Sequence, residues 1–463
     1  MKTKIGIILF FWISSGSAQN WQWSGTGTNE KAEDIIEYKD SSLIAAGKFF
    51  KFNSLNSGGS FPLIVKGKKN SSGIWQWSSI GSTDGSIHDI ISYNGDLYIG
   101  GQFGLINQMQ QASGIAKYTT FWSAFANAGV MCSINAASSC GVYALCEYNG
   151  ELYAAGTFTS MSGIPVENIA RWNGTSWSAV GGGITTASIN DGVRKLIVFN
   201  NDLYAMGYFT GAGNVSAQNM ARWDGSSWSS VTTFPANSQI LSAEVFDGAL
   251  YVGGNFTTVG SVPVNGVARY DGISWSDAGQ GLQNSGGVTC MAALNDTLYA
   301  GGIFNFPSSS SVNSHVARWN GSSWEFFGAF GISFSSGSVS MLRAAYGDLY
   351  VSGLFTSIDN KPVSNIAKIT TSKPVVAGMQ ENVLQGFSVF PNPMHTEARL
   401  TITKPGPEVS AGIYNLLGEE VRKLERLDDR FEIKRNDLSS GVYIIRVTSA
   451  AGTQIERLII GDE

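Results

Sequence analysis

The sequence has few charged residues and few histidines for its length. Of 463 residues, 14% are Asp, Glu, Lys or Arg, whereas an average soluble domain carries about 25%. The formal net charge is −5 and Lys/Arg-rich runs are absent, which argues against nucleic acid as a partner because a phosphate backbone requires a basic surface. The three histidines, His88, His315 and His395, show no metal-ligand spacing. We therefore expect neither a metal site nor a cofactor.

Long apolar runs are also scarce. Lys2 and Lys4 precede an apolar run at residues 5–13, and the small residues Gly16-Ser17-Ala18 follow it. This order is typical of a secretory signal peptide, and the run is too short to span ~30 Å of hydrocarbon. We expect residues 1–18 to be a signal peptide, and we expect no transmembrane segment in the mature chain.

Cysteine is rare, with four residues in the whole chain. Export permits disulfides, and Cys132 and Cys140 flank a polar segment that has the composition of a loop. A bridge that closes this loop would stabilise the fold by roughly 2–3 kcal/mol, so we predict a Cys132–Cys140 disulfide. Cys146 and Cys290 lie in apolar, strand-like runs and are predicted to be buried free thiols.

Glycine and aromatic residues are abundant, which suits short strands and tight turns. A segment built around Leu-Tyr, followed by small residues and Phe, recurs seven times, in one copy with Leu-Ile for Leu-Tyr. The copies are residues 38–49, 93–103, 148–158, 199–209, 246–256, 294–304 and 346–355.

A second motif alternates with the first. Ala170-Arg-Trp-Asn-Gly-Thr-Ser-Trp177 recurs at residues 221–228, 268–275 and 317–324. Each repeat of about 50 residues thus holds four short alternating runs, with Asn-Gly or Asp-Gly often marking a hairpin turn. Four antiparallel strands per unit are typical of a propeller blade.

The two ends of the repeat array predict how the ring closes. Trp21-Gln-Trp-Ser24 matches the fourth strand of a blade, and residues 365–370 match a third strand with no fourth after it. We therefore expect an all-β protein whose residues 20–370 form a seven-bladed propeller closed by the N-terminal strand. The repeats resemble those of kelch-type propellers and of fungal cortical polarity-marker proteins, a resemblance that implies the fold but no single function.

The composition changes near residue 370, where charged residues become frequent, and Trp is absent after Trp324. We expect a linker at residues 371–386. Alternating runs in residues 387–463 then predict a small, Ig-like β-sandwich.

Four motifs of this C-terminal module stand in a characteristic order: Val389-Phe-Pro-Asn-Pro393, residues 413–421, residues 437–446 and Arg457-Leu-Ile-Ile460. The module resembles the type A C-terminal sorting domain of type IX secretion substrates, although Arg457 stands where Lys is usual. The resemblance implies export across the outer membrane by the type IX machinery, followed by surface anchoring or release. The residues that carry the sorting motifs are Pro391, Asn392, Pro393, Gly418, Gly441 and Tyr443.

The connections between strands two and three, and between one blade and the next, are long and variable, and we expect them to share one face of the ring. Binding residues concentrate on such loops. The non-repeating candidates on this long-loop face are His88, Asp191, His315, Phe330 and Phe334.

The leading hypothesis is therefore a non-enzymatic protein that binds a glycan or a protein through the long-loop face. The sequence contains no nucleophile elbow, HExxH motif or phosphate loop, so no catalytic residue is assigned. The alternative is a polysaccharide-active enzyme with acids near the ring axis, since the separation of a catalytic acid pair is spatial. The non-periodic acids available are Asp84, Asp89, Asp191, Glu244, Asp277, Glu325 and Asp359, of which Glu244 lies in an innermost-strand run.

Overall fold

Two compact units, Met1–Thr371 and Ser372–Glu463, make up the chain. All regular elements of the described residues are β-strands, and no helix in this part of the chain is long and apolar enough to cross a membrane. The computed structural model describes residues 27–460 except 58–60, 73, 109, 126–128, 132–139, 189–190, 233, 236–237, 306–312, 332–338, 360, 371–386, 391–393, 395, 403–408, 416–419, 428–429, 437 and 450–451.

The first unit is a succession of antiparallel sheets, well represented by the one formed by β21 (Gly192–Phe199), β22 (Asp202–Tyr208), β25 (Met220–Trp223) and β26 (Trp228–Ser230). These strands lie side by side in chain order. Asn200 and Asn201, with φ of 49° and 63°, form the turn between β21 and β22, as a two-residue hairpin with positive φ requires. The alternating runs of the sequence therefore mark the strands to within a residue or two.

Seven such sheets are present among the described residues. Their first strands are β1 (Ala32–Tyr38), β7 (Ser86–Tyr93), β14 (Gly141–Tyr148), β21, β27 (Gln239–Phe246), β33 (Gln283–Leu294) and β37 (Val339–Ala345). Their second strands are β2 (Ser42–Gly47), β8 (Asp96–Gln102), β15 (Glu151–Thr157), β22, β28 (Ala249–Asn255), β34 (Thr297–Asn305) and β38 (Asp348–Gly353). Their third strands are β5 (Leu63–Lys69), β11 (Ile115–Tyr118), β18 (Ile169–Trp172), β25, β31 (Val267–Tyr270), β35 (Asn313–Trp319) and β41 (Ile366–Thr370).

Six of these sheets have a fourth strand in the described residues: β6 (Trp75–Ser82), β12 (Trp122–Ala124), β19 (Trp177–Ala179), β26, β32 (Trp275–Asp277) and β36 (Trp324–Gly331). The last sheet contains β37, β38 and β41. Trp21–Ser24, the predicted fourth strand of that sheet, and the predicted signal peptide lie outside the described residues.

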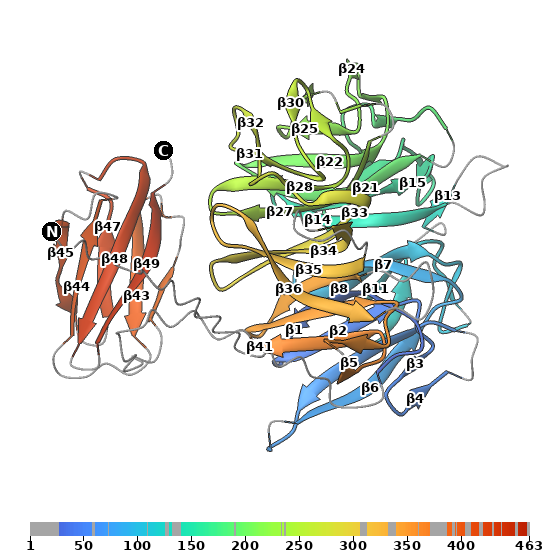
Figure 1. Ribbon diagram of the computed structural model, residues 1–463, viewed down its shortest axis with the longest axis horizontal. Helices are drawn as coiled ribbons and strands as arrows, with labels where there is room; N and C mark the ends of the chain where they lie inside the picture. Colours follow the sequence, from blue (N-terminus) through green and yellow to red (C-terminus); the bar gives the residue numbers. More distant parts are fainter. Residues whose placement is uncertain are drawn as a thin grey trace, which may run out of the picture. The chain divides into compact units, whose positions relative to one another are not determined.

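The first strands contact one another in cyclic order. Each contacts the first strand of the next sheet, and β37 contacts β1. The first sheet, in blue, and the last sheet, in orange, accordingly lie side by side, although they come from the beginning and the end of the unit's sequence (Figure 1). Aromatic side chains fill the space between sheets. Tyr153, for example, is buried in one cluster with Trp223 and Trp228 of the following sheet.

A small hairpin connects the second and third strands in most sheets, where the sequence predicts long loops. These hairpins are β3–β4 (Lys51–Phe52, Leu55–Asn56), β9–β10 (Leu105–Ile106, Gln110–Gln111), β16–β17 (Ser160–Met161, Ile164–Pro165), β23–β24 (Gly211–Ala212, Val215–Ser216), β29–β30 (Thr258–Val259, Val262–Pro263) and β39–β40 (Ser357–Ile358, Lys361–Pro362).

The connection that leaves one sheet often pairs with the hairpin of the next. β13 (Val130–Met131) pairs with β16, β20 (Ile184–Thr185) pairs with β23, and the end of β36 pairs with β39. Isolated bridges join Thr83 to Ile106 and Thr28 to Phe52 in the same manner. These pairings hold successive sheets together on the side of the long connections.

The second unit consists of two antiparallel sheets. One contains β42 (Phe387–Phe390), β43 (Glu397–Ile402), β46 (Arg426–Leu427) and β47 (Arg430–Lys434), and the other contains β44 (Val409–Tyr414), β45 (Glu420–Leu424), β48 (Gly441–Ser449) and β49 (Gly452–Ile460). Both sheets contribute to one apolar core, which includes Leu400, Ile413 and Ile445. Gly441 and Tyr443 lie in β48, whereas Pro391, Asn392, Pro393 and Gly418 lie outside the described residues.

Candidate functional site

Each of the seven first strands contains a β-bulge at the same place. In β7, Ile87 pairs with Gly101 and Asp89 with Gly100, so His88 is an extra residue without a partner in β8. A bulge of this kind re-aims a side chain. The equivalent extra residues complete a set that we call the bulge ring: Glu33, His88, Tyr143, Arg194, Leu241, Thr289 and Ser340.

All seven members of the bulge ring line one cavity of about 170 Å³, which we call the central pocket. Residues that directly follow the bulges, such as Asp34, Asp89 and Lys195, line it as well. The bulges lie near the beginning of the first strands, at the end that follows the long connection from the preceding sheet. The central pocket therefore lies where all seven sheets approach one another, toward the long-loop side.

Three aromatic and cationic side chains of the bulge ring stack on one another. The ring of His88 lies 4.8 Å from that of Tyr143 at an interplanar angle of 25°, and the Arg194 guanidinium lies 3.9 Å from the centre of the Tyr143 ring. His88 also contacts Gln102 Oε1 through Nε2 at 3.2 Å. Burial lowers the pKa of His88, although the charge of Glu33 opposes this, so the imidazole is neutral at physiological pH.

A charged cluster lies beside the bulge ring. Arg343 Nε and Nη2 donate to the two carboxylate oxygens of Asp34 at 2.6 and 3.0 Å, and Arg343 Nη2 lies 3.9 Å from Asp89. Burial and then the negative charge of Asp34 raise the pKa of Asp89 to about 7. Asp89 is consequently a carboxyl group that retains its proton to unusually high pH.

Glu244, the acid that the sequence places in an innermost strand, lies in β27 as predicted. Burial raises its pKa, which the positive charges of Lys195 and Arg343 oppose. Lys195 likewise lowers the pKa of Asp89. Its ammonium group therefore acts on carboxyl groups of two other sheets.

Polar bonds between first strands stabilise the site. Asp89 Oδ2 accepts a hydrogen bond from Leu145 N at 2.7 Å, and Thr289 Oγ1 donates to Val339 O at 2.6 Å. Each of these bonds joins one sheet to the next, so the pocket wall is fixed by the packing of the whole unit rather than by a mobile loop.

The five predicted binding residues do not form one site on the loops. His88 is a strand residue, and it reaches the central pocket because of the bulge in β7. Asp191 lies directly before β21, in a long connection as predicted, and its carbonyl oxygen accepts a hydrogen bond from Thr157 Oγ1. His315 and Phe330 are in β35 and β36, not in loops, because pairing in this sheet extends further than in the others. Phe334 lies outside the described residues.

Three of the non-periodic acids have structural roles. Asp84 Oδ1 accepts from Gly104 N and Leu105 N, each at 2.7 Å. Asp277 accepts from Gln280 N at 2.9 Å, and Glu325 pairs with Arg318 at 2.9 Å. These contacts fix turns and strand ends, so they do not indicate a catalytic role.

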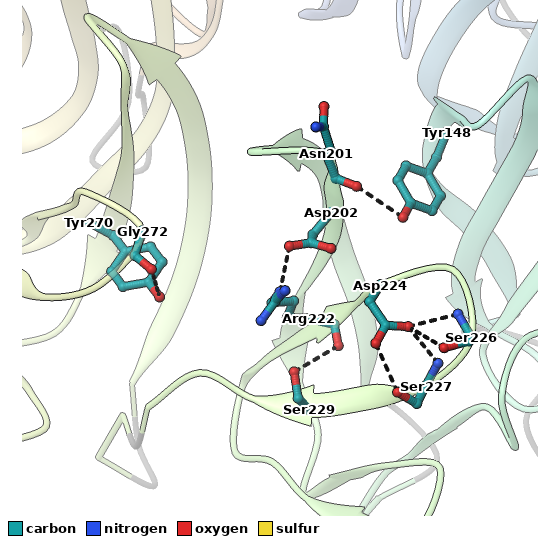
Figure 2. Close-up of polar contacts among 10 residues, drawn as sticks. All are labelled: Tyr148, Asn201, Asp202, Arg222, Asp224, Ser226, Ser227, Ser229, Tyr270 and Gly272. Atoms are coloured by element: carbon teal, nitrogen blue, oxygen red, sulfur yellow. Dashed lines mark hydrogen bonds and ion pairs between the residues drawn. The ribbon is translucent and has the colours of Figure 1, made fainter. Parts of the chain in front are cut away.

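The repeated polar residues also stabilise the sheets (Figure 2). Asp202 pairs with Arg222 of the third strand at 2.6 Å. Asp224 Oδ1 accepts from Ser226 N and Ser227 N at 2.8 Å. These hydrogen bonds lower the pKa of Asp224, as expected for a turn that a carboxylate closes.

Cys146 and Cys290 are free thiols, as predicted, but only Cys290 is buried, whereas Cys146 is partly exposed. Cys132 lies outside the described residues, so the Cys132–Cys140 disulfide stays a prediction. Among the described residues, no group of three or more His, Cys, Asp or Glu is arranged to hold a metal ion.

The sequence indicates none of the bulge-ring residues except His88. A signal is nevertheless present. In six copies the bulge residue stands ten positions before the tyrosine of Leu-Tyr, as Tyr143 does before Tyr153, and in the first copy eleven before Ile44. These positions can be recognised because each lies at a nearly fixed distance from a repeated motif, whereas the amino acid at the position differs from copy to copy.

Comparisons with known proteins agree with both units. Residues 388–461 match the family described as secretion system C-terminal sorting domain, and residues 247–272 match a domain of unknown function (DUF5122) beta-propeller. These matches define a β-propeller protein with a C-terminal sorting domain. It is exported by the type IX secretion system to the cell surface or the medium. The kelch-like type of the propeller stays a prediction.

No curated protein matches the chain. Among solved structures, 57 chains match. One of them, "YCF48 bound to D1 peptide", is 10% identical, with a TM-score of 0.36, over 64% of this chain and 95% of that chain.

Proposed function

We propose that this protein is a non-enzymatic binding protein of the cell surface or the medium, which recognises a glycan or a protein through its long-loop face. The central pocket is the focus of this face. The observation that carries the proposal is the bulge ring, in which every sheet sends one extra side chain into the same cavity. Such convergence of polar groups on one hollow is typical of a binding site.

The proposal includes a closed, seven-bladed ring. In an inner sheet, Ile184 N donates to Glu167 O at 2.9 Å. Asn168, which follows Glu167, donates from Nδ2 to Ile184 O at 2.8 Å. Thr28 makes the equivalent pair of bonds with the last sheet: Thr28 N donates to Ser364 O at 3.3 Å, and Asn365 Nδ2 donates to Thr28 O at 2.9 Å.

The sequence spacing supports the same closure. Ile184 stands seven residues after Trp177, which begins a fourth strand, and Thr28 stands seven residues after Trp21. This equivalence supports the prediction that Trp21–Ser24 supplies the fourth strand of the last blade. The test is amide hydrogen exchange at the edge of β41 that faces away from β38. Slow exchange supports closure, and the fast exchange of a free edge contradicts it.

A second candidate function is polysaccharide cleavage. It is favoured by one observation, the pKa of Asp89 in the central pocket, which burial and the charge of Asp34 raise to about 7, because a carboxyl group that stays protonated near neutral pH can act as a general acid.

One experiment separates these functions. The purified mature chain is incubated with a panel of insoluble polysaccharides and, in parallel, with immobilised surface proteins, and soluble sugar is assayed in the same tubes. Retention without released sugar is the expected result. Released sugar would favour the enzyme, and no retention on any member of the panel would contradict the proposed binding function.

A further inference from the structure

The bulge ring differs from its surroundings in how its residues vary. The residue before each bulge is fully buried in all seven sheets and is aliphatic: Ala32, Ile87, Val142, Val193, Ile240, Val288 and Val339. The bulge residues themselves are seven different amino acids at seven equivalent positions. Packing therefore explains why the residues before the bulges are all aliphatic. It does not explain the variety of the bulge residues, which line the cavity.

Each carboxyl group that lines the central pocket lies near a cation. Glu33 pairs with Lys31 at 3.0 Å, Asp34 pairs with Arg343 at 2.6 Å, and Asp89 lies 3.9 Å from Arg343. Every carboxylate that lines the pocket thus has a cation nearby.

Lys195 has no such partner. Across the described parts of the chain, no carboxylate lies within 4.0 Å of its ammonium group, in contrast to the pairs of Arg343. Lys195 lines the central pocket, so its charge is available to a ligand there. Together with Arg194 beside it, Lys195 forms a cationic arc that favours an anionic ligand.

Hydroxyl groups line the pocket two and three sheets further on in the cyclic order. Thr289 Oγ1 donates to Val339 O at 2.6 Å, and Ser340 Oγ donates to Ser352 O at 3.4 Å. A hydroxyl group has one proton and two acceptor lone pairs. With their protons engaged, these two groups present acceptors to the pocket, which suits a ligand that itself carries hydroxyl donors.

The size of the pocket limits the ligand. A cavity of about 170 Å³ is smaller than the ~300–1,000 Å³ of typical sites for drug-sized ligands. It admits a single small ring and not a stretch of polymer, so only the end of a chain can enter.

We propose that the central pocket binds one terminal sugar that carries a carboxylate, such as a uronic acid at the end of a glycan. Lys195 and Arg194 contact the carboxylate, and the Thr289 and Ser340 side accepts hydrogen bonds from the sugar hydroxyls. This inference rests on the proposed binding function and assigns its ligand class.

The test is calorimetric titration of the mature chain with methyl glucuronide and with methyl glucoside, which differ in the carboxylate. We expect the glucuronide to bind at least about tenfold more tightly, since one charge-assisted hydrogen bond supplies about that factor. This preference should decrease as salt is added. Equal binding of the two sugars, or no binding of either, would overturn the proposal.

Two variants locate the effect. Lys195→Gln should reduce the preference for the glucuronide severalfold, because only Arg194 then contacts the carboxylate, whereas the matched control Lys361→Gln, at an exposed position of β40, should leave it unchanged. Thr289→Val should weaken the binding of both sugars by a similar factor and keep the preference. Thermal melting of each variant establishes that it is folded. A folded Lys195→Gln protein that prefers the glucuronide as strongly as the wild type does would contradict the assignment.

The outcomes also separate this proposal from the broader one. Retention on polysaccharides or proteins without any preference for the acidic sugar would refute the ligand class and leave the binding function intact. Loss of all retention would refute both.

Discussion

Arg343 of the last sheet and Asp34 of the first form a two-point ion pair, although they lie 309 positions apart in the chain. The Asp34 side chain is 3% exposed, and its second oxygen also accepts a hydrogen bond from Ile90 N of the following sheet at 3.3 Å. This single carboxylate thus connects three sheets at the point where the first and last sheets meet.

Removal of Arg343 should therefore weaken the whole propeller. In Arg343→Met the Asp34 carboxylate stays buried without its cation. We expect the free energy of unfolding to fall by about 1–3 kcal/mol, less than for a fully buried pair because Arg343 is a third exposed. Urea unfolding followed by tryptophan fluorescence measures this, since every Trp precedes residue 325.

Arg318→Met is the matched control for that experiment. Arg318 pairs with Glu325 on the surface, where both side chains are more than 40% exposed, so we expect a change below about 1 kcal/mol. Equal losses in the two variants would show that the Asp34 pair has no special role in closing the ring.

The raised pKa of Asp89 predicts a pH dependence of stability. Its pKa is about 7 in the folded chain, above the ordinary 3.8, so the folded state holds the proton more tightly than the unfolded state. The stability that this provides is fully present below about pH 4 and is lost as the pH rises through about 7. Asp89→Asn removes that loss.

We therefore expect Asp89→Asn to gain stability relative to the wild type by about 2–3 kcal/mol when the pH is raised from 5 to 8. Parallel urea unfolding at the two pH values measures the difference. A difference between variant and wild type that is the same at pH 5 and pH 8 would show that Asp89 titrates normally.

The cysteines provide a chemical test. Burial raises the pKa of Cys146 and of Cys290 to about 12, so their thiols should react slowly with alkylating agents in the native protein. In the unfolded, unreduced chain we expect two modified cysteines, Cys146 and Cys290, and peptide mapping should find Cys132 linked to Cys140. Modification of all four without reduction would contradict the disulfide.

The sorting domain should be needed for export but not for folding of the propeller. After deletion of residues 387–463 we expect an unchanged melting transition of the propeller and accumulation of the chain in the periplasm. Protease accessibility on intact cells reports the location. Surface display of the truncated chain at the wild-type level would contradict the sorting role.

The strands and hairpins could be predicted from the sequence because their signals are local. Alternating runs separated by Asn-Gly or Asn-Asn turns place β21 and β22 almost residue by residue. The signals of the C-terminal module are equally local, and the sorting domain that they predict is confirmed by the family match of residues 388–461.

The candidate site could not be predicted in the same way. A bulge adds one residue to one strand, and the alternation of a single strand does not reveal it. The bulge residues therefore resemble ordinary strand residues in the sequence. Sequence reasoning instead selects residues expected in loops, such as Asp191 and Phe330. The Asp34–Arg343 pair is harder still to foresee, since the two residues meet only when the last sheet packs against the first.

The most direct test of the account compares retention of three chains on the same panel of polysaccharides and proteins. In Leu241→Trp a large side chain replaces a bulge-ring residue and obstructs the central pocket. In Ile273→Trp the same side chain is placed at a turn residue that is 94% exposed and lies outside the pocket. We expect the wild type and Ile273→Trp to be retained and folded Leu241→Trp not to be. Equal retention of all three would contradict a function centred on the pocket.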